Sequence, residues 1–360
     1  MKLKHTLRLS ATAIALLASF AANAGDHGVK VTISPVKNVH EASDDVFVNV
    51  TLTNTGTSPK YVLKYLTPFS EQPEHLFEVT RDGKPVQFLG AHIKRGTPKA
   101  SDYLLLKPGK SYTRKVELSA QYDMSISGDY KIQYHVGSMN LFNSNPNAQS
   151  LVSHTELGEL ESNESSFAVN GIHPRGYEAP TPQQLMQQTL AGSLTYTNCT
   201  SSQKTTVASA VANAKTYASN SLSYLNAGNK GARYTTWFGT YDAGRYSTVK
   251  SHFSNILNSF NNQAVVVDCG CTQSYYAYVY PTQPYKIYVC KAFWSAPMTG
   301  TDSKAGTMVH EMSHFNVVGG TDDWAYGQSA AKSLATSNPG KAVDNADSHE
   351  YFAENTPFLN

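Results

Sequence analysis

The hydrophobic residues of this chain change their spacing between its first and second halves. From Val29 to about Asn170, apolar and polar residues alternate in short runs separated by turn signals such as Asp82-Gly83 and Pro108-Gly109. This period of two is typical of β-strands, and short strands with frequent turns predict an antiparallel sandwich of immunoglobulin-like architecture. We expect its strands at 29–33, 46–52, 61–65, 76–79, 103–106, 112–118 and 130–134.

A segment rich in proline and glycine follows at 171–182. From Thr200 the apolar residues recur at spacings of three and four, which predicts a long helix. Further helices are expected at 243–257, 303–317, 323–336 and 345–354, and short strands at 264–267, 276–280 and 286–289. We therefore expect a multidomain chain, in which an all-β domain (25–170) and a mostly helical α+β domain with a small sheet (195–360) are joined by a linker at 171–194.

The first 24 residues have the three parts of a secretory signal peptide. Met1 to Arg8 is short and basic, Leu9 to Phe20 is apolar, and Ala22-Asn23-Ala24 fits the small-residue pattern that precedes a cleavage site. We therefore expect cleavage after Ala24 and a secreted, extracellular protein.

Charge excludes several classes of partner. The 360 residues carry 29 Lys+Arg and 27 Asp+Glu, a formal net charge of +2. Removing Lys2, Lys4 and Arg8 with the signal peptide leaves 26 basic against 27 acidic residues, so no cationic surface for nucleic acid or anionic lipid is predicted. The long apolar run lies in the signal peptide, and we expect no membrane association after its cleavage.

All four cysteines lie in the second half, at Cys199, Cys269, Cys271 and Cys290. An even count in an exported chain predicts two disulfides. A bond between Cys269 and Cys271 is sterically poor, so Cys199 is expected to pair with one of these two and Cys290 with the other. A zinc site built on the Cys-Gly-Cys pair is the weaker alternative, because four-thiolate sites usually have two-residue spacers and occur in reducing compartments.

The sequence His310-Glu311-Met312-Ser313-His314 has the H-E-x-x-H pattern. On a helix, residues four apart lie on one face, so both imidazoles can bind one zinc ion while Glu311 acts as general base on a water molecule. The structural alternative is an amphipathic helix that merely carries two histidines.

Spacing leaves the third zinc ligand open. Asp322 and Asp323 follow Gly319-Gly320, which ends the helix and lets the chain fold back. Glu350 or Glu354 on a later helix would instead give a thermolysin-like site.

The residues after the helix resemble a known family. Gly320 to Gly327 reads G-T-D-D-W-A-Y-G and matches the G-T-x-D-x-x-Y-G box that, with H-E-x-x-H, defines the aspzincins, the deuterolysin-type zinc metalloendopeptidases. The resemblance implies that the second domain is a zincin catalytic domain and that Asp323 is the third ligand of one zinc ion per chain. It also implies that Tyr326 donates a hydrogen bond to the oxyanion of the tetrahedral intermediate.

The similarity extends to the peptidyl-Lys metalloendopeptidases of that group and covers about Thr195 to Pro357. It implies that Asp347 and Glu350 line the pocket for the residue just after the scissile bond. Their i, i+3 spacing places both carboxylates on one helix face, where they would pair with an ammonium ion. A solvated first helical turn is the alternative interpretation. The similarity also implies the disulfides Cys199–Cys269 and Cys271–Cys290.

We therefore expect a monomeric zinc endopeptidase that hydrolyses proteins or peptides on the N-terminal side of Lys. The first domain is expected to be a propeptide that assists folding and blocks the active site, without a thiolate on the zinc, because no cysteine precedes Cys199. No Lys lies between Lys131 and Lys204, and Arg175 is the sole basic residue there, so a strictly Lys-directed enzyme could not cut itself in the linker. The alternatives are a broad-specificity deuterolysin-like protease and, less favoured, a non-enzymatic exported binding protein that uses the sandwich.

Overall fold

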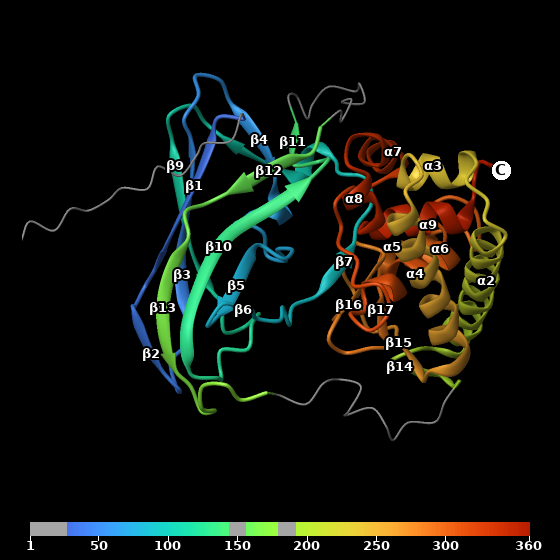
Figure 1. Cartoon of the computed structure of the whole chain (residues 1–360), viewed down its shortest axis with the longest axis horizontal. Helices are drawn as coiled ribbons and strands as arrows, with labels where there is room; N and C mark the ends of the chain where they lie inside the picture. The colour runs from blue at the N-terminus through green and yellow to red at the C-terminus, as the bar shows by residue number, and fades with distance from the viewer. Residues whose placement is uncertain (1–26, 144–155, 179–191) are drawn as a thin grey trace, which may run out of the picture.

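The computed structural model describes residues 27–143, 156–178 and 192–360 (Figure 1). The predicted signal peptide at 1–24 and part of the predicted linker at 171–194 lie outside the described residues. Among the residues described, no helix combines the length and apolar character needed to cross a membrane.

Strands fill the N-terminal part of the chain, at the left of Figure 1. Their bounds are β1 (Val29–Pro35), β2 (Val39–Glu41), β3 (Phe47–Asn54), β4 (Lys60–Leu63), β5 (Phe77–Arg81), β6 (Lys84–Pro85), β8 (Tyr103–Leu106), β9 (Ser111–Glu117), β10 (Gly128–Ser138), β11 (Phe142–Asn143), β12 (Gly158–Glu161) and β13 (Ser165–Asn170). The sheet orders are β1-β3-β9, β2-β13-β10-β5-β6 with β12 beside β10, and β11-β4-β8. Two 3-10 helices, η1 (Lys64–Leu66) and η2 (Ala100–Asp102), connect strands.

The predicted alternation is visible as alternating burial. In β10, Tyr130, Ile132 and Tyr134 are buried, while Asp129 and Lys131, which alternate with them, are exposed. All strands predicted for this part are present, but the sandwich is not purely antiparallel, because the short edge strand β2 pairs parallel with β13. The immunoglobulin-like architecture stays a prediction.

Helices dominate the C-terminal part, at the right of Figure 1. They are α2 (Ser201–Asn226), α3 (Ala232–Phe238), α4 (Ala243–Asn262), α5 (Lys291–Ser295), α6 (Lys304–His314), α7 (Gln328–Ser337), α8 (Pro339–Val343) and α9 (Ala346–Glu354). The strands of this part are β14 (Leu194–Thr197), β15 (Val265–Asp268), β16 (Ala277–Val279) and β17 (Lys286–Val289). The helix predicted at 323–336 begins only at Gln328, because the preceding residues form a loop that ends at Gly327 with a φ of 86°.

One strand of the N-terminal part belongs to the sheet of the C-terminal part. The strand β7 (His92–Lys94) pairs antiparallel with β16 and completes the order β14-β15-β17-β16-β7. Lys94 lies opposite Ala277, and His92 lies opposite Val279. In Figure 1, β7 is the teal strand that leaves the β-rich part and reaches the edge of the other sheet.

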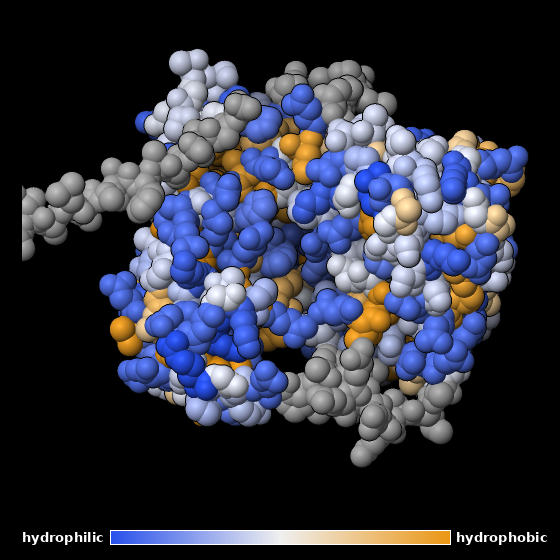
Figure 2. Space-filling view, viewed as in Figure 1, coloured by the Kyte–Doolittle hydropathy of each residue, from blue (hydrophilic) through white to orange (hydrophobic). Residues whose placement is uncertain are grey.

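The hydrophobic cores of the two parts are interlocked. Met139 is buried in the core of the helical part, and Tyr326 is buried among residues of the strand-rich part. Gly137 allows the two parts to approach closely. A Cβ on this residue would lie 2.7 Å from the Trp324 ring, which leaves no space for a side chain. The face seen in Figure 2 is mostly polar and is hollowed where the two parts meet.

Candidate active site

The start of α6 is fixed against α9. The Ser303 hydroxyl accepts a hydrogen bond from Gly306 N at 2.9 Å, and Glu354 Oε1 accepts hydrogen bonds from Ser303 N (2.8 Å) and Ser303 Oγ (2.7 Å). A Cβ on Gly306 would lie 2.1 Å from Glu354 Oε1, so glycine permits this contact. Ser303 therefore caps α6, the Glu354 carboxylate holds Ser303 instead of joining the histidines, and the thermolysin-like alternative with Glu354 as ligand is wrong.

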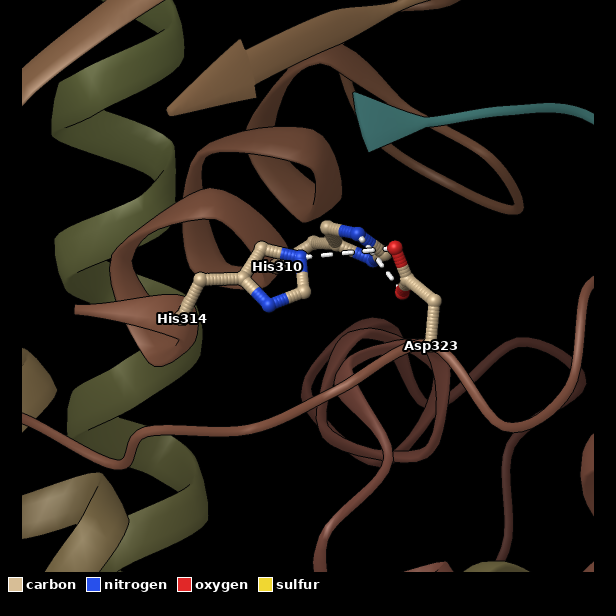
Figure 3. Close-up of side chains that lie close together, drawn as sticks. All are labelled: His310, His314 and Asp323. Carbon is tan, nitrogen blue, oxygen red and sulfur yellow. Dashed lines mark ion pairs between the residues drawn. The ribbon is translucent and has the colours of Figure 1, made fainter. Parts of the chain in front are cut away.

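Three side chains converge at the other end of α6. His310 Nε2 lies 3.4 Å from Asp323 Oδ1, and His314 Nε2 lies 3.7 Å from Asp323 Oδ2. Figure 3 shows the three side chains pointing toward one another, with Asp323 supplied by the loop after the helix. The neighbouring Asp322 is instead 38% exposed and lies 3.5 Å from His92 Nδ1, so of the two aspartates Asp323 joins the histidines.

This group fits a metal ion. The Nε2 atoms of His310 and His314 and both carboxylate oxygens of Asp323 are buried without a hydrogen-bond partner. Leaving such atoms unpaired costs about 1–3 kcal/mol each, and the cost disappears when a cation binds them. His314 Nδ1 lies 2.6 Å from the carbonyl oxygen of Thr321, which assigns its proton to Nδ1 and leaves the Nε2 lone pair for the metal. Two imidazoles and a carboxylate are a donor set that zinc prefers.

Two further side chains of the predicted site lie close to this group. Glu311 is completely buried, both its oxygens lack hydrogen-bond partners, and burial raises its pKa to about 8 against the opposing effects of His310 and Lys94. A carboxylate with a pKa near neutrality is suited to general-base catalysis.

Tyr326 is held by the N-terminal part. Its ring packs edge-to-face on Tyr65, with centroids 5.5 Å apart, and its backbone N–H donates to Asn140 Oδ1 at 2.9 Å. Its hydroxyl is buried and has no hydrogen-bond partner. No sequence pattern marks Asn140, because its contact with Tyr326 joins positions 186 residues apart.

The predicted acidic pair forms a buried pocket. The side chains of Asp347 and Glu350 are 1% and 0% exposed, so the alternative of a solvated helical turn is wrong. The pocket holds Lys94 of β7, whose Nζ lies 3.5 Å from Asp347 Oδ1 and forms a close ion pair with Glu350 Oε2. Burial lowers the pKa of Lys94, but Glu350, Asp347 and Asp302 together hold it well above its ordinary value.

The acidic pocket also contacts the candidate metal ligand His310. His310 Nδ1 lies 3.0 Å from Asp347 Oδ1 and 3.3 Å from Glu350 Oε2, the same oxygens that face Lys94. Although burial raises the pKa of Asp347, Lys94 and His310 bring it down to about 2. Glu350 thus faces Nδ1 and not the Nε2 side of His310, and the pocket orients that imidazole toward Asp323.

Lys94 and Asp302 belong to the site but lie outside both sequence motifs. No local pattern marks Lys94, because it is 256 positions away from Glu350. The Asp302 carboxylate accepts a hydrogen bond from the Tyr351 hydroxyl at 2.8 Å and faces the acidic pocket. Its φ of 50° is a signal only the structure provides.

All four cysteines form disulfides. Cys199 is bonded to Cys269 and Cys271 to Cys290, which is the pairing implied by the family resemblance. The zinc site on the Cys-Gly-Cys pair is therefore wrong, because its thiols are consumed in these bonds.

Comparisons with known proteins agree with this geometry. The family model for the aspzincins, described as lysine-specific metallo-endopeptidase, matches residues 223–354. An extracellular protease of Aeromonas hydrophila is 47% identical over 323 residues, covering 89% of this chain and 91% of the relative. A peptidyl-Lys metalloendopeptidase of Armillaria mellea is 37% identical over 340 residues, covering 92% of each chain.

Among solved structures, a zinc peptidase from Grifola frondosa is 52% identical, with a TM-score of 0.44, and covers 45% of this chain and 100% of its own. The two sequence relatives match nearly the whole chain, including its strand-rich part, and both are named as proteases. The chain therefore belongs to the aspzincin family of metalloendopeptidases.

Proposed function

We propose that this chain is the secreted precursor of a monomeric zinc endopeptidase that cleaves peptide bonds on the N-terminal side of Lys. His310, His314 and Asp323 would hold one zinc ion. When bound there, zinc supplies a Lewis acid that lowers the pKa of water and polarises the carbonyl of the scissile bond.

Two other side chains handle the protons and charge of the reaction. Glu311 accepts a proton from the attacking water as its oxygen bonds to the peptide carbon, and passes that proton to the leaving nitrogen as the C–N bond breaks. The Tyr326 hydroxyl donates a hydrogen bond to the carbonyl oxygen as it becomes negative. The buried and unpaired atoms of both side chains support these roles.

The observation that carries the Lys specificity is the position of Lys94. Its ammonium group contacts both Asp347 and Glu350. The strand β7 pairs with β16 at the edge of the sheet, in the way that an extended peptide adds a strand to a sheet. Lys94 stands in for the substrate residue just after the scissile bond. A neutral side chain there would deprive two buried carboxylates of their ammonium partner, which disfavours it.

The same contacts support a propeptide role for residues 25–170. Lys94 fills the proposed substrate pocket, and Tyr65 and Asn140 hold the ring and the backbone N–H of Tyr326. Residues 25–170 therefore block the catalytic domain (195–360) until cleavage at 171–194 separates them. These residues supply the strand β7, the side chain of Lys94 and the contacts with Tyr326.

The test is to sequence the peptides that the matured protease releases from a denatured protein, with the Glu311→Ala variant produced in parallel. New N-termini that are almost all Lys, together with a silent variant, support the proposal. Scattered cleavage would favour the broad-specificity deuterolysin-like alternative. A fully active Glu311→Ala variant would refute the role of Glu311.

A further inference from the structure

We propose that Tyr276 is a third wall of the lysine pocket and a specificity-determining residue, whose aromatic ring selects for the positive charge of the substrate side chain. The inference rests on the proposed function, because Lys94 is taken as the stand-in for the substrate lysine. Neither the H-E-x-x-H pattern nor the G-T-x-D-x-x-Y-G box includes Tyr276.

Tyr276 contacts Lys94 in two ways. The Lys94 Nζ lies 5.2 Å from the centroid of the Tyr276 ring, within the range of a cation–π interaction. The Tyr276 backbone N–H donates to the Lys94 carbonyl oxygen at 3.1 Å. This main-chain hydrogen bond fixes the position of the bound residue along the strand edge. In that position its ammonium group lies beside the ring.

The ring and the carboxylates act on different properties of the bound side chain. Asp347 and Glu350 provide full negative charges at hydrogen-bonding distance, whereas the ring offers an apolar surface with a negative face. The ring can therefore contact the methylene groups of any long side chain but gains additional energy only from a charged end. Burial raises the pKa of Tyr276, and Asp302 acts in the same direction, so the phenol stays neutral.

The discriminating measurement compares two peptides that differ only in the residue after the scissile bond, which is Lys in one and the uncharged norleucine in the other. Cation–π interactions contribute about 0.5–2 kcal/mol, so Tyr276→Leu should lower the ratio of the two kcat/KM values by about 2- to 30-fold. Tyr276→Phe keeps the ring and should keep the ratio within about twofold. The norleucine peptide reports in each case whether the variant is folded and active.

Tyr278→Leu is the matched control. Tyr278 lies two residues further along the chain, within β16, but its ring stacks on Tyr288 at 4.5 Å, and the ratio should not change. An unchanged ratio in Tyr276→Leu, or an equal loss for both peptides, would overturn the role of Tyr276 while leaving the acidic pocket in place. A parent enzyme without preference for Lys would instead overturn the proposed specificity and this inference with it.

Discussion

Substitution of Lys94 tests how strongly the strand-rich part is bound to the helical part. Its side chain is 1% exposed, and it joins the strand-rich part to two buried carboxylates of α9. Lys94→Met keeps the length of the side chain and removes the charge. In the variant, Asp347 and Glu350 face an apolar group when β7 is docked. When β7 has separated, water fills the pocket and solvates the two carboxylates. The substitution therefore destabilises only the docked state.

The size of the effect follows from this difference. Removing one partner of a buried ion pair typically costs 3–5 kcal/mol. The lower limit applies here, because His310 Nδ1 lies 3.0 Å from Asp347 Oδ1 and 3.3 Å from Glu350 Oε2 and still offsets part of the negative charge. A cost of about 3 kcal/mol raises the population of undocked molecules roughly 100-fold.

The assay is hydrolysis of a short Lys peptide by the full chain before its linker is cut, with integrity verified by gel electrophoresis. Lys94→Met should raise this activity about 100-fold over the parent chain. In chains that also carry Glu311→Ala and cannot digest themselves, the Tyr276 amide, which donates to Lys94, should exchange its hydrogen faster by a similar factor.

Lys131→Met is the control, because Lys131 pairs with Glu164 at 2.8 Å on the surface, where the two side chains are 56% and 54% exposed. Surface pairs contribute about 0–1 kcal/mol, and this one does not touch the C-terminal part, so the activity should stay at the parent level. A Lys94→Met chain that is folded and as silent as the parent would refute the reasoning.

Two other predictions concern the site and the stability of the fold. Asp347→Asn should weaken zinc binding by about 10- to 100-fold, because it disturbs the group that orients His310, and competition with a chelator measures this; unchanged affinity would contradict the orienting role. The pair formed by the half-buried His252 and the buried His349, with Nδ1 and Nε2 3.0 Å apart, should make the fold less stable in acid. Burial lowers the pKa of His349 to about 3 and that of His252 to about 4, both below the 6.5 of the unfolded chain, so the unfolded state binds more protons. The contribution of the two histidines to stability is complete above about pH 6.5 and is lost as the pH falls toward 4. In urea unfolding, the free energy of unfolding should fall less with acid in His252→Gln than in the parent chain. An equal fall in both chains would refute the assignment.

The parts of the site that depend on local geometry could be predicted from the sequence. The spacing of His310 and His314 places them on one face of α6, because a helix returns to the same face after four residues. Choosing Asp323 over Asp322 needed the family resemblance. The two carboxylates are adjacent in the sequence, and which of them turns inward depends on the path of the backbone after Gly320, whose φ is 60°.

The contribution of β7 could not be predicted. The strand has three residues, too few for a periodic pattern, and its partner β16 lies far along the chain. Burial of Lys94 also goes against the strong preference of lysine for the surface, a preference overcome here only because two carboxylates from α9 meet it. Sequence patterns predict strands well in isolation, as for β8, but they carry no information on which sheet a strand joins.

The pairing of β7 with β16 has a consequence for solubility. When β7 departs, β16 becomes the border of its sheet and presents unpaired N–H and C=O groups to the surroundings. An exposed strand edge can pair with any extended chain. The N–H and C=O groups that a substrate would use are therefore also available to a second copy of the enzyme. While β7 stays in place, it pairs with the N–H and C=O groups on this side of β16, so no other chain can pair with β16 there.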